Sequence, residues 1–137
     1  MVLKTTHRTP TVKEYNELRH AADWPTFPEE LVKEALSNSF FSVVIHDEHD
    51  LILGMGRVIG DNAIYLHISD VIIRPEFQGQ GIGKLIMQEL LAHVENVGGK
   101  NTNIGLMCSK GREEFYKRFG FEERPNEKFG AGMIKVK

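Results

Sequence analysis

The sequence lacks several features that would place a chain in a specialised class. Its single cysteine, Cys108, cannot form an intrachain disulfide, and no group of cysteines and histidines has zinc-ligand spacing. The start of the chain has no apolar stretch like that of a signal peptide, and the apolar runs elsewhere are far shorter than the ~20 residues that cross a bilayer. We therefore expect a soluble, cytoplasmic protein that uses no metal and does not enter a membrane.

An excess of charge of one sign is also missing. Lys and Arg number 17 and Asp and Glu number 19, which gives a formal net charge of −2. Such a chain lacks the basic field that attracts nucleic acids, so we expect no nucleic-acid partner. What the sequence does contain is 41% hydrophobic and 26% charged residues, and no repeat or polar linker divides its 137 residues. This profile is typical of one globular domain, here 1–137.

Hydrophobic periodicity and turn residues predict an α+β fold with the order β-α-α-β-β-β-α-β-α-β-β. Thr11 and Glu14 form a capping-box pattern at the start of the first helix. Only the β-α-β crossover within 63–108 requires parallel pairing, because a helix connects its two strands. Helices are expected over 11–22, from Pro28, from Gly81 to before Gly98, and over 110–119. Strands are expected over 2–8, 40–46, 51–59, 63–73, 103–108, 121–124 and 133–136.

Glycine is the enriched residue, with 13 in the chain and three of them within Gln78-Gly79-Gln80-Gly81-Ile82-Gly83. A glycine-rich turn between a strand and a helix directs free backbone amides and the positive end of the helix dipole to one point, which favours an anion. A P-loop would need glycine at Gln78 and serine or threonine at Leu85, and a dinucleotide fingerprint starting at Gly79 would need glycine at Lys84. Both motifs are excluded. On these residues alone, an anion site and a purely structural tight turn are the two interpretations.

The hexapeptide matches Q/R-x-x-G-x-G/A, the acetyl-CoA signature of the Gcn5-related N-acetyltransferase (GNAT) superfamily. The likeness extends to the strand before it, to the amphipathic helix after it, and to Phe115-Tyr116-Lys117-Arg118-Phe119-Gly120-Phe121, which is similar to the family's late F-Y-x-x-x-G-F segment. Over 70–121 the chain therefore resembles a GNAT protein. The resemblance implies a mixed, mostly antiparallel sheet of about seven strands flanked by about four helices. It also implies acetyl-CoA as cosubstrate, no metal, and a homodimer as a frequent assembly.

The resemblance further implies how the cofactor is bound. Backbone amides near Gly81 and Gly83 would hold the CoA pyrophosphate, because glycine permits close approach of the backbone. The backbone of 71–73 would pair with the pantetheine arm as an added strand. The implied cofactor-binding residues are Val71, Ile72, Ile73, Gln78, Gly79, Gln80, Gly81, Ile82, Gly83, Lys84 and Tyr116.

Acetyl transfer from a thioester to an amine needs a base for the amine, whose pKa is ~10.4 when free, and an acid for the departing sulfur. Tyr116 matches the family's general acid and would be protonated at neutral pH, since the pKa of tyrosine is ~10. Packing beside its aromatic neighbours is its alternative role. Asp70 is the candidate base, or else a structural hydrogen-bond acceptor. His67 and Ser69 lie on the same strand and face away from Asp70 unless a β-bulge intervenes, as the family commonly has there.

In the GNAT fold, the first helices and their connecting loop usually form one wall of the acceptor site. The resemblance makes Trp24 and Phe27 of that loop candidate substrate-binding residues, together with His67 and Ser69 of the strand that leads to the thioester. An aromatic residue in the loop also serves to cover the core. Cys108 is expected to be a small core residue rather than an acyl carrier. We expect an N-acetyltransferase that moves the acetyl group from acetyl-CoA to a primary amine of a small molecule by direct attack in a ternary complex. The alternatives are acetylation of a protein amine and a non-catalytic module that senses acyl-CoA.

Overall fold

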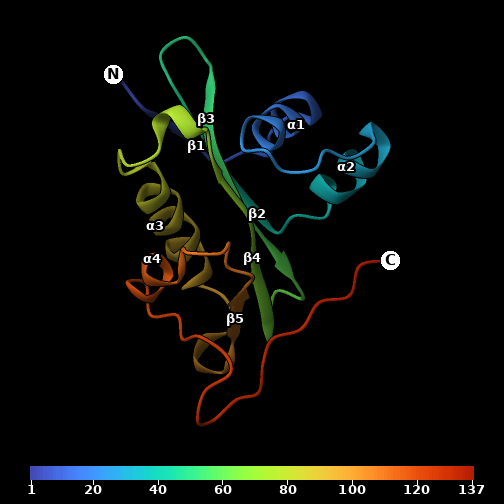
Figure 1. The fold of residues 1–137 in the computed structure, drawn as a ribbon, viewed down its shortest axis with the longest axis vertical. Coiled ribbons are helices and arrows are strands. Elements are labelled where there is room, and N and C mark those ends of the chain that lie inside the picture. Colours follow the sequence, from blue (N-terminus) through green and yellow to red (C-terminus); the bar gives the residue numbers. More distant parts are fainter. The chain divides into compact units, whose positions relative to one another are not determined.

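Five strands form one sheet whose spatial order, β1-β2-β3-β4-β5, follows the chain order in a computed structural model that describes residues 1–137 (Figure 1). The predicted α+β order is confirmed as far as the fourth α-helix. The elements are β1 (Lys4–Thr6), α1 (Val12–Ala21), α2 (Glu29–Ser37), β2 (Phe41–His46), β3 (Ile52–Gly60), β4 (Tyr65–Ile73), the 3-10 helix η1 (Pro75–Phe77), α3 (Ile82–Val94), the 3-10 helix η2 (Gly99–Asn101), β5 (Asn103–Leu106) and α4 (Glu113–Lys117).

Residues 1–106 and residues 107–137 form two compact units. The first unit contains the whole sheet and the helices α1 to α3, and the second contains α4 and the C-terminal segment. The expectation of one domain over 1–137 stays a prediction. None of the helices combines the length and the apolar character that crossing a membrane requires.

The strands β1 to β4 pair antiparallel, whereas β4 and β5 pair in parallel through the crossover that contains α3. The predicted position of the parallel pair is confirmed. A β-bulge interrupts the antiparallel pairing of β3 and β4, because the register shifts between Met55 and Arg57. Two residues of β4, Asp70 and Val71, therefore lie opposite the single residue Gly56.

The helices cover opposite faces of the sheet, with α1 and α2 on one face and α3 on the other (Figure 1). The predicted capping box starts α1: Thr11 Oγ1 accepts a hydrogen bond from the amide of Glu14 at 3.1 Å, and Glu14 Oε1 accepts one from the amide of Thr11 at 2.8 Å. The capping box fixes the start of α1, and the buried side of this helix packs in the core on this face of the sheet. That core consists of Tyr15, Leu18, Val32, Leu36, Val44, Ile52, Met55 and Ile72.

On the other face, α3 approaches β3 closely at two positions that lack side chains. A Cβ atom at Gly56 would lie 2.6 Å from Cγ2 of Ile86 and 2.9 Å from Cδ1 of Leu90. A Cβ atom at Gly54 would lie 3.1 Å from Cδ1 of Ile86. Both helix side chains are fully buried. The two glycines therefore let the helix pack against the backbone of the sheet, at the level of the bulge.

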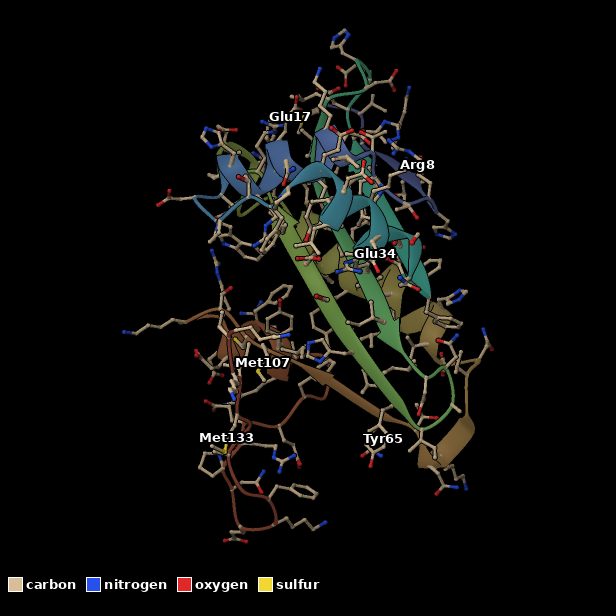
Figure 2. The ribbon with its side chains drawn as sticks, turned by 90° about the vertical axis from the view of Figure 1, so that its right-hand side faces the viewer. Arg8, Glu17, Glu34, Tyr65, Met107 and Met133 are labelled. Atoms are coloured by element: carbon tan, nitrogen blue, oxygen red, sulfur yellow. The ribbon has the colours of Figure 1, made fainter.

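Two expected strands are absent, because the segments 121–124 and 133–136 are irregular. Local contacts organise this part of the chain instead, and Nε of Arg124 donates to the carbonyl of Gly130 at 2.7 Å. The alternating pattern at the C-terminus leaves apolar side chains exposed, and Met133 is 87% exposed (Figure 2). Strand structure comes from pairing and packing more than from residue preference, so the pattern alone was insufficient. The helix α4 is also shorter than expected at both ends.

Candidate functional site

A glycine turn in a left-handed conformation joins β4 to α3. Gly79 and Gly81 have φ values of +79° and +84°, a region that side chains rarely enter. Apart from the glycine itself and its two neighbours in the chain, no residue has an atom within 4 Å of the position that a Cβ would take at either glycine, so the backbone here is open. Gly81 is the N-cap of α3, and no side chain caps this helix. The amides of the first helical turn therefore present an uncapped, positive helix end.

The side chains around this turn leave the backbone accessible. Ile82 is 1% exposed and packs in the core, so its amide is the only group that it offers to a ligand. Nε2 of Gln78 donates back to the carbonyl of Ile73 at 3.5 Å, and Lys84 is exposed on the first turn of α3. Backbone amides with a lysine beside them suit phosphate groups. The residues present therefore fit the diphosphate of a cofactor such as CoA.

The half of β4 that leads to this turn pairs on one side only. The ladder between β4 and β5 ends at Ile68 and Leu106, so 69–73 pairs with β3 alone. An extended chain that carries amide groups is able to add to such an edge. Val71, Ile72 and Ile73, the residues predicted to meet the pantetheine arm, lie on this edge.

The bulge determines which face of the sheet Asp70 occupies. Asp70 has a φ of +54°, in the left-handed region, although it is not glycine. Its carboxylate reaches Arg57, whose ladder partner is Ser69, so Ser69 and Asp70 face the same side, that of α1 and α2. His67, two residues before Ser69, shares this face. The structure thus brings together three candidate residues that a regular strand would separate.

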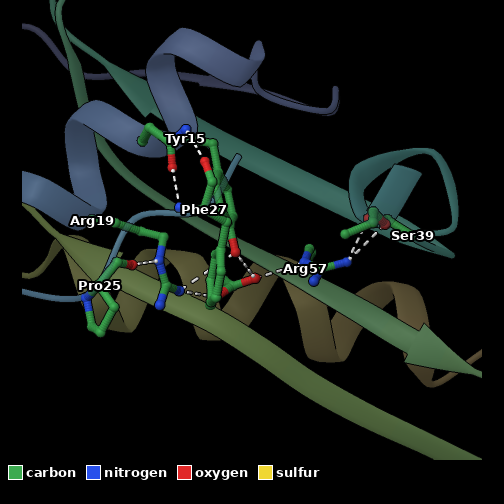
Figure 3. A network of polar contacts seen from close by, with 9 residues as sticks. Tyr15, Arg19, Pro25, Phe27, Ser39 and Arg57 are labelled. Atoms are coloured by element: carbon green, nitrogen blue, oxygen red, sulfur yellow. Dashed lines mark hydrogen bonds and ion pairs between the residues drawn. The ribbon is translucent and has the colours of Figure 1, made fainter. Parts of the chain in front are cut away.

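Asp70 lies at the centre of a buried ionic network. Figure 3 shows this network and labels the donors Tyr15, Arg19 and Arg57. Its Oδ2 accepts hydrogen bonds from Nε of Arg57 at 2.7 Å and from Oη of Tyr15 at 3.0 Å, and its Oδ1 accepts one from Nη1 of Arg19 at 3.1 Å. The side chain of Asp70 is 8% exposed and those of the two arginines are 10% exposed. We call these four residues the Asp70 network. Since donors occupy both carboxylate oxygens, the geometry favours a structural acceptor over a general base.

Arg19 links this network to the loop between α1 and α2. Its Nε donates to the carbonyl of Pro25 at 2.6 Å, and its guanidinium lies 4.6 Å from the ring centre of Phe27 and 5.3 Å from that of Trp24. The candidate substrate residues Trp24 and Phe27 thus contact Arg19, and Trp24 also packs against the core beneath α1 and α2. Sequence reasoning missed Arg19, because it is 51 residues away from Asp70 in the chain and no local motif joins them.

His67 is partly buried near the end of the ladder between β4 and β5. Burial lowers the pKa of its imidazole, and the charge of Asp70 partly opposes this effect. A histidine with a lowered pKa is neutral at pH 7 and is able to accept a proton. A Cβ atom at Gly105, its partner on β5, would lie 3.9 Å from Nδ1 of the ring. His67 therefore has the protonation state that a base requires.

Tyr116 lies on α4, in the unit of residues 107–137. Its ring centre is 5.0 Å from that of Phe115 and 6.3 Å from that of Phe121. Burial, and after it the thiolate that Cys108 forms at alkaline pH, raises the pKa of Tyr116, so the phenol carries its proton at neutral pH. This is the protonation state of a general acid, and the acid role itself stays a prediction.

The expectation that Cys108 is a core residue is wrong, because its side chain is partly exposed. Its Sγ donates to the carbonyl of Ser109 at 3.1 Å. Burial of part of the thiol, followed by the charge of Glu113, raises the pKa of Cys108. A thiol with a raised pKa is less nucleophilic at neutral pH because less of it is thiolate. The local environment therefore gives no support to a role as acyl carrier.

Comparison with known proteins gives a consistent result. Residues 11–137 match the family model of the acetyltransferase (GNAT) domain. The crystal structure of a protein of unknown function from meticillin-resistant Staphylococcus aureus is similar with a TM-score of 0.89 and 31% identity, covering 98% of this chain and 100% of that chain. The histone acetyltransferase TAP1 of Glycine max is 32% identical over 114 residues, which are 74% of this chain and 48% of that protein. The chain thus spans about half the length of this curated relative.

A third similarity concerns the fold alone. Glucosamine-6-phosphate N-acetyltransferase from Arabidopsis thaliana has a TM-score of 0.73 at 18% identity, with 99% of both chains covered. The mixed sheet with helices on both faces is therefore the arrangement of GNAT structures.

Proposed function

Since this chain belongs to the GNAT acetyltransferase family, we propose that it transfers the acetyl group of acetyl-CoA to a primary amine of a small molecule. The observation that carries the proposal is the junction of β4 and α3. Two left-handed glycines in open space precede an uncapped helix start, next to a strand edge that pairs on one side only. This combination suits a ligand with a diphosphate at one end and amide groups along its length.

In this proposal, the backbone does most of the cofactor binding. The amides of Gly81, Ile82 and Gly83 hold the diphosphate, Lys84 adds a cation, and the edge of 71–73 pairs with the amide groups of the arm. When bound, acetyl-CoA supplies a thioester whose carbonyl carbon the amine attacks, so that a C–N bond forms, the C–S bond breaks, the nitrogen loses a proton and the sulfur gains one.

Side chains of this protein donate and accept these protons. Oη of Tyr116 carries the proton that the leaving group requires, in line with its raised pKa. The imidazole of His67 is assigned the amine proton rather than Asp70, because His67 is neutral at pH 7 whereas donors occupy both oxygens of the Asp70 carboxylate. Ser69 lies on the same face as both.

The acceptor amine is assigned to the face of α1 and α2. Trp24 and Phe27 lie in the loop between these helices, around the guanidinium of Arg19, and offer aromatic surface to a small amine. A protein amine is the second acceptor to test, because the relative TAP1 is a histone acetyltransferase. A cytoplasmic location and a homodimer are further expectations of the proposal.

The first experiment measures CoA affinity by calorimetry for the wild type and for Gly81→Ala. We expect about tenfold weaker binding in the variant, since a side chain at this φ distorts the turn and blocks close approach of the diphosphate. Gly99→Ala is the matched control: Gly99 has a φ of +78° and nothing within 4 Å of its Cβ position, but it lies beyond the other end of α3. Equal loss of binding in both variants would contradict the assignment of the turn.

The second experiment measures thiol release from acetyl-CoA with a panel of small amines and a histone tail peptide. Tyr116→Phe should lower kcat with little change in CoA affinity, because only the proton donor is removed. Tyr65→Phe is the control, since Tyr65 is 65% exposed at the start of β4 (Figure 2). CoA binding without thiol release for any amine would favour the sensor alternative over the enzyme.

A further inference from the structure

We propose that the Asp70 network is a positioning device, which holds the bulge of β4 and thereby orients the backbone of 71–73. The inference rests on the proposed function in one respect, namely that this segment is the edge assigned to the cofactor. Asp70 would then act through the backbone rather than by proton transfer, and Tyr15, Arg19 and Arg57 would be positioning residues with it.

The backbone of Asp70 is in a conformation that its surroundings must impose. A φ of +54° brings Cβ close to the backbone, and although Asp tolerates this better than most residues, bulges of this kind commonly place glycine there. Asp23, Asp50 and Asn62 also have positive φ values, but they lie in turns or loops between elements, whereas Asp70 lies within a strand. A strained residue inside regular structure persists only where its contacts over-determine it.

Each cationic donor to Asp70 is itself fixed by further contacts. Nη1 of Arg57 donates to the carbonyl of Ala35 on α2 at 3.1 Å and to Oγ of Ser39 at 3.2 Å. Arg19 is fixed by a carbonyl of the loop after α1 and by the aromatic rings of that loop. The carboxylate therefore connects β4 with α1, with the loop, with α2 and with β3.

The opposite face of the sheet restrains the bulge as well. A Cβ at Gly56 would lie 3.6 Å from Cγ2 of Val71, so Val71 lies on the α3 face, next to the position where Ile86 and Leu90 of α3 approach Gly56. If β4 shifted by one residue against β3, Asp70 would turn toward the apolar α3 face and Ile72 would leave the core under α1 and α2. A carboxylate on the apolar face would be buried without a partner. The network therefore specifies one register, a role for which buried ion pairs are better suited than for raw stability.

The test compares Asp70→Asn with Asp50→Asn. Both substitutions replace Asp by Asn at a positive φ, but the side chain of Asp50 is 82% exposed in a loop. We expect Asp70→Asn to change the NMR amide shifts of 69–73 in the free protein and to lower kcat/KM by about 10- to 100-fold, the scale of a misplaced reacting group. The loss should persist at neutral pH, where His67 is unprotonated, while the acidic limb of the profile shifts to lower pH because the charge of Asp70 no longer raises the pKa of His67. Asp50→Asn should change neither the amide shifts nor kcat/KM.

Tyr15→Phe is a milder second variant, which removes one donor and keeps the ring in the core. We expect shift changes in the same amides and a smaller loss of kcat/KM, so that the proposal can be tested even if Asp70→Asn does not fold. Unchanged amide shifts in both variants would overturn the proposal. So would a pH profile of Asp70→Asn in which the acidic limb is abolished rather than shifted, because that result identifies Asp70 as the base. If the wild type does not bind CoA, the proposed function fails, while the amide shifts still decide the positioning role.

Discussion

The two faces of the sheet are built in different ways around the same point, the bulge of β4. On the α3 face the contact is apolar and depends on shape, because Gly56 leaves room for Ile86 and Leu90. On the face of α1 and α2 the contact is ionic, because Asp70 is paired with the buried side chains of Arg19 and Arg57. One face thus fixes how closely a helix approaches, and the other fixes which residue of the strand lies where.

This difference matches the two tasks in the proposed function. The α3 face leads to the glycine turn, where backbone amides must be accessible and side chains must be small. The other face carries His67, Ser69 and the aromatic loop, where the orientation of individual side chains decides the chemistry. Packing alone is tolerant of small displacements, whereas a hydrogen-bonded ion pair is directional.

The largest effect is expected on the ionic face, from Arg57→Met. Removing one cation leaves the buried carboxylate of Asp70 with fewer partners, and we expect the free energy of unfolding to fall by about 3 kcal/mol. Urea denaturation measures this loss. Arg118→Met is the control, because Arg118 is exposed on the chain beyond α4. An unchanged free energy of unfolding in Arg57→Met would contradict the comparison, because an apolar side chain would then serve on this face as well as a paired cation does.

On the apolar face, Gly56→Ala should lower the free energy of unfolding by about 2 kcal/mol, through overpacking against α3. The added methyl would lie 2.6 Å from Cγ2 of Ile86, whereas at Gly105 on β5 the nearest atom is 3.9 Å away. Gly105→Ala is therefore the matched control, with no loss or a gain of about 0.5 kcal/mol, because Gly is unfavourable in strands. Equal effects of the two substitutions, again measured in urea, would mean that the close approach of α3 is not required.

The smallest effect is expected at the start of α1, from Glu14→Gln. The ion pair with Arg8 and the capping box lower the pKa of Glu14 to about 2 from its ordinary 4.5. A carboxylate whose pKa is depressed by folding stabilises the fold above pH 4.5, and this contribution is lost as the pH falls toward 2. We expect Glu14→Gln to cost about 1 kcal/mol at pH 7. The difference from wild type should shrink on acidification, as unfolding curves between pH 7 and pH 2.5 would measure. If the difference in the free energy of unfolding between Glu14→Gln and wild type did not depend on pH, the loss would come from helix capping and not from the charge of Glu14.

The parts of the fold that depend on short stretches of sequence could be predicted. The capping box of Thr11 and Glu14 and the turn through Gly79 and Gly81 were both confirmed, because each depends on residues that are neighbours in the chain. The C-terminal strands were not, because a short segment such as 133–136 gains strand structure from a pairing partner and not from its own pattern.

The candidate site was predictable only in part, for the same reason. The residues of β4 were identified, but a regular strand would place Asp70 and Ser69 on opposite faces, and only the bulge puts them together. The partners of Asp70 come from α1 and β3, and nothing near Arg19 or Arg57 in the sequence signals a shared carboxylate. The sequence therefore left Asp70 as either a base or a structural acceptor, and the two guanidinium partners that the structure gives it favour the acceptor.

The short parallel ladder of β4 with β5 has a consequence for the order of folding. The strands β2, β3 and β4 are joined by brief turns, whereas β5 can pair with β4 only after the chain from Ile73 to Asn103 has closed a loop that contains α3. Closing a longer loop costs more entropy, and distant contacts slow folding. We therefore expect the meander, with its bulge, to form early and β5 to dock late, so that in pulse-labelled hydrogen exchange the amides of β5 gain protection after those of β3.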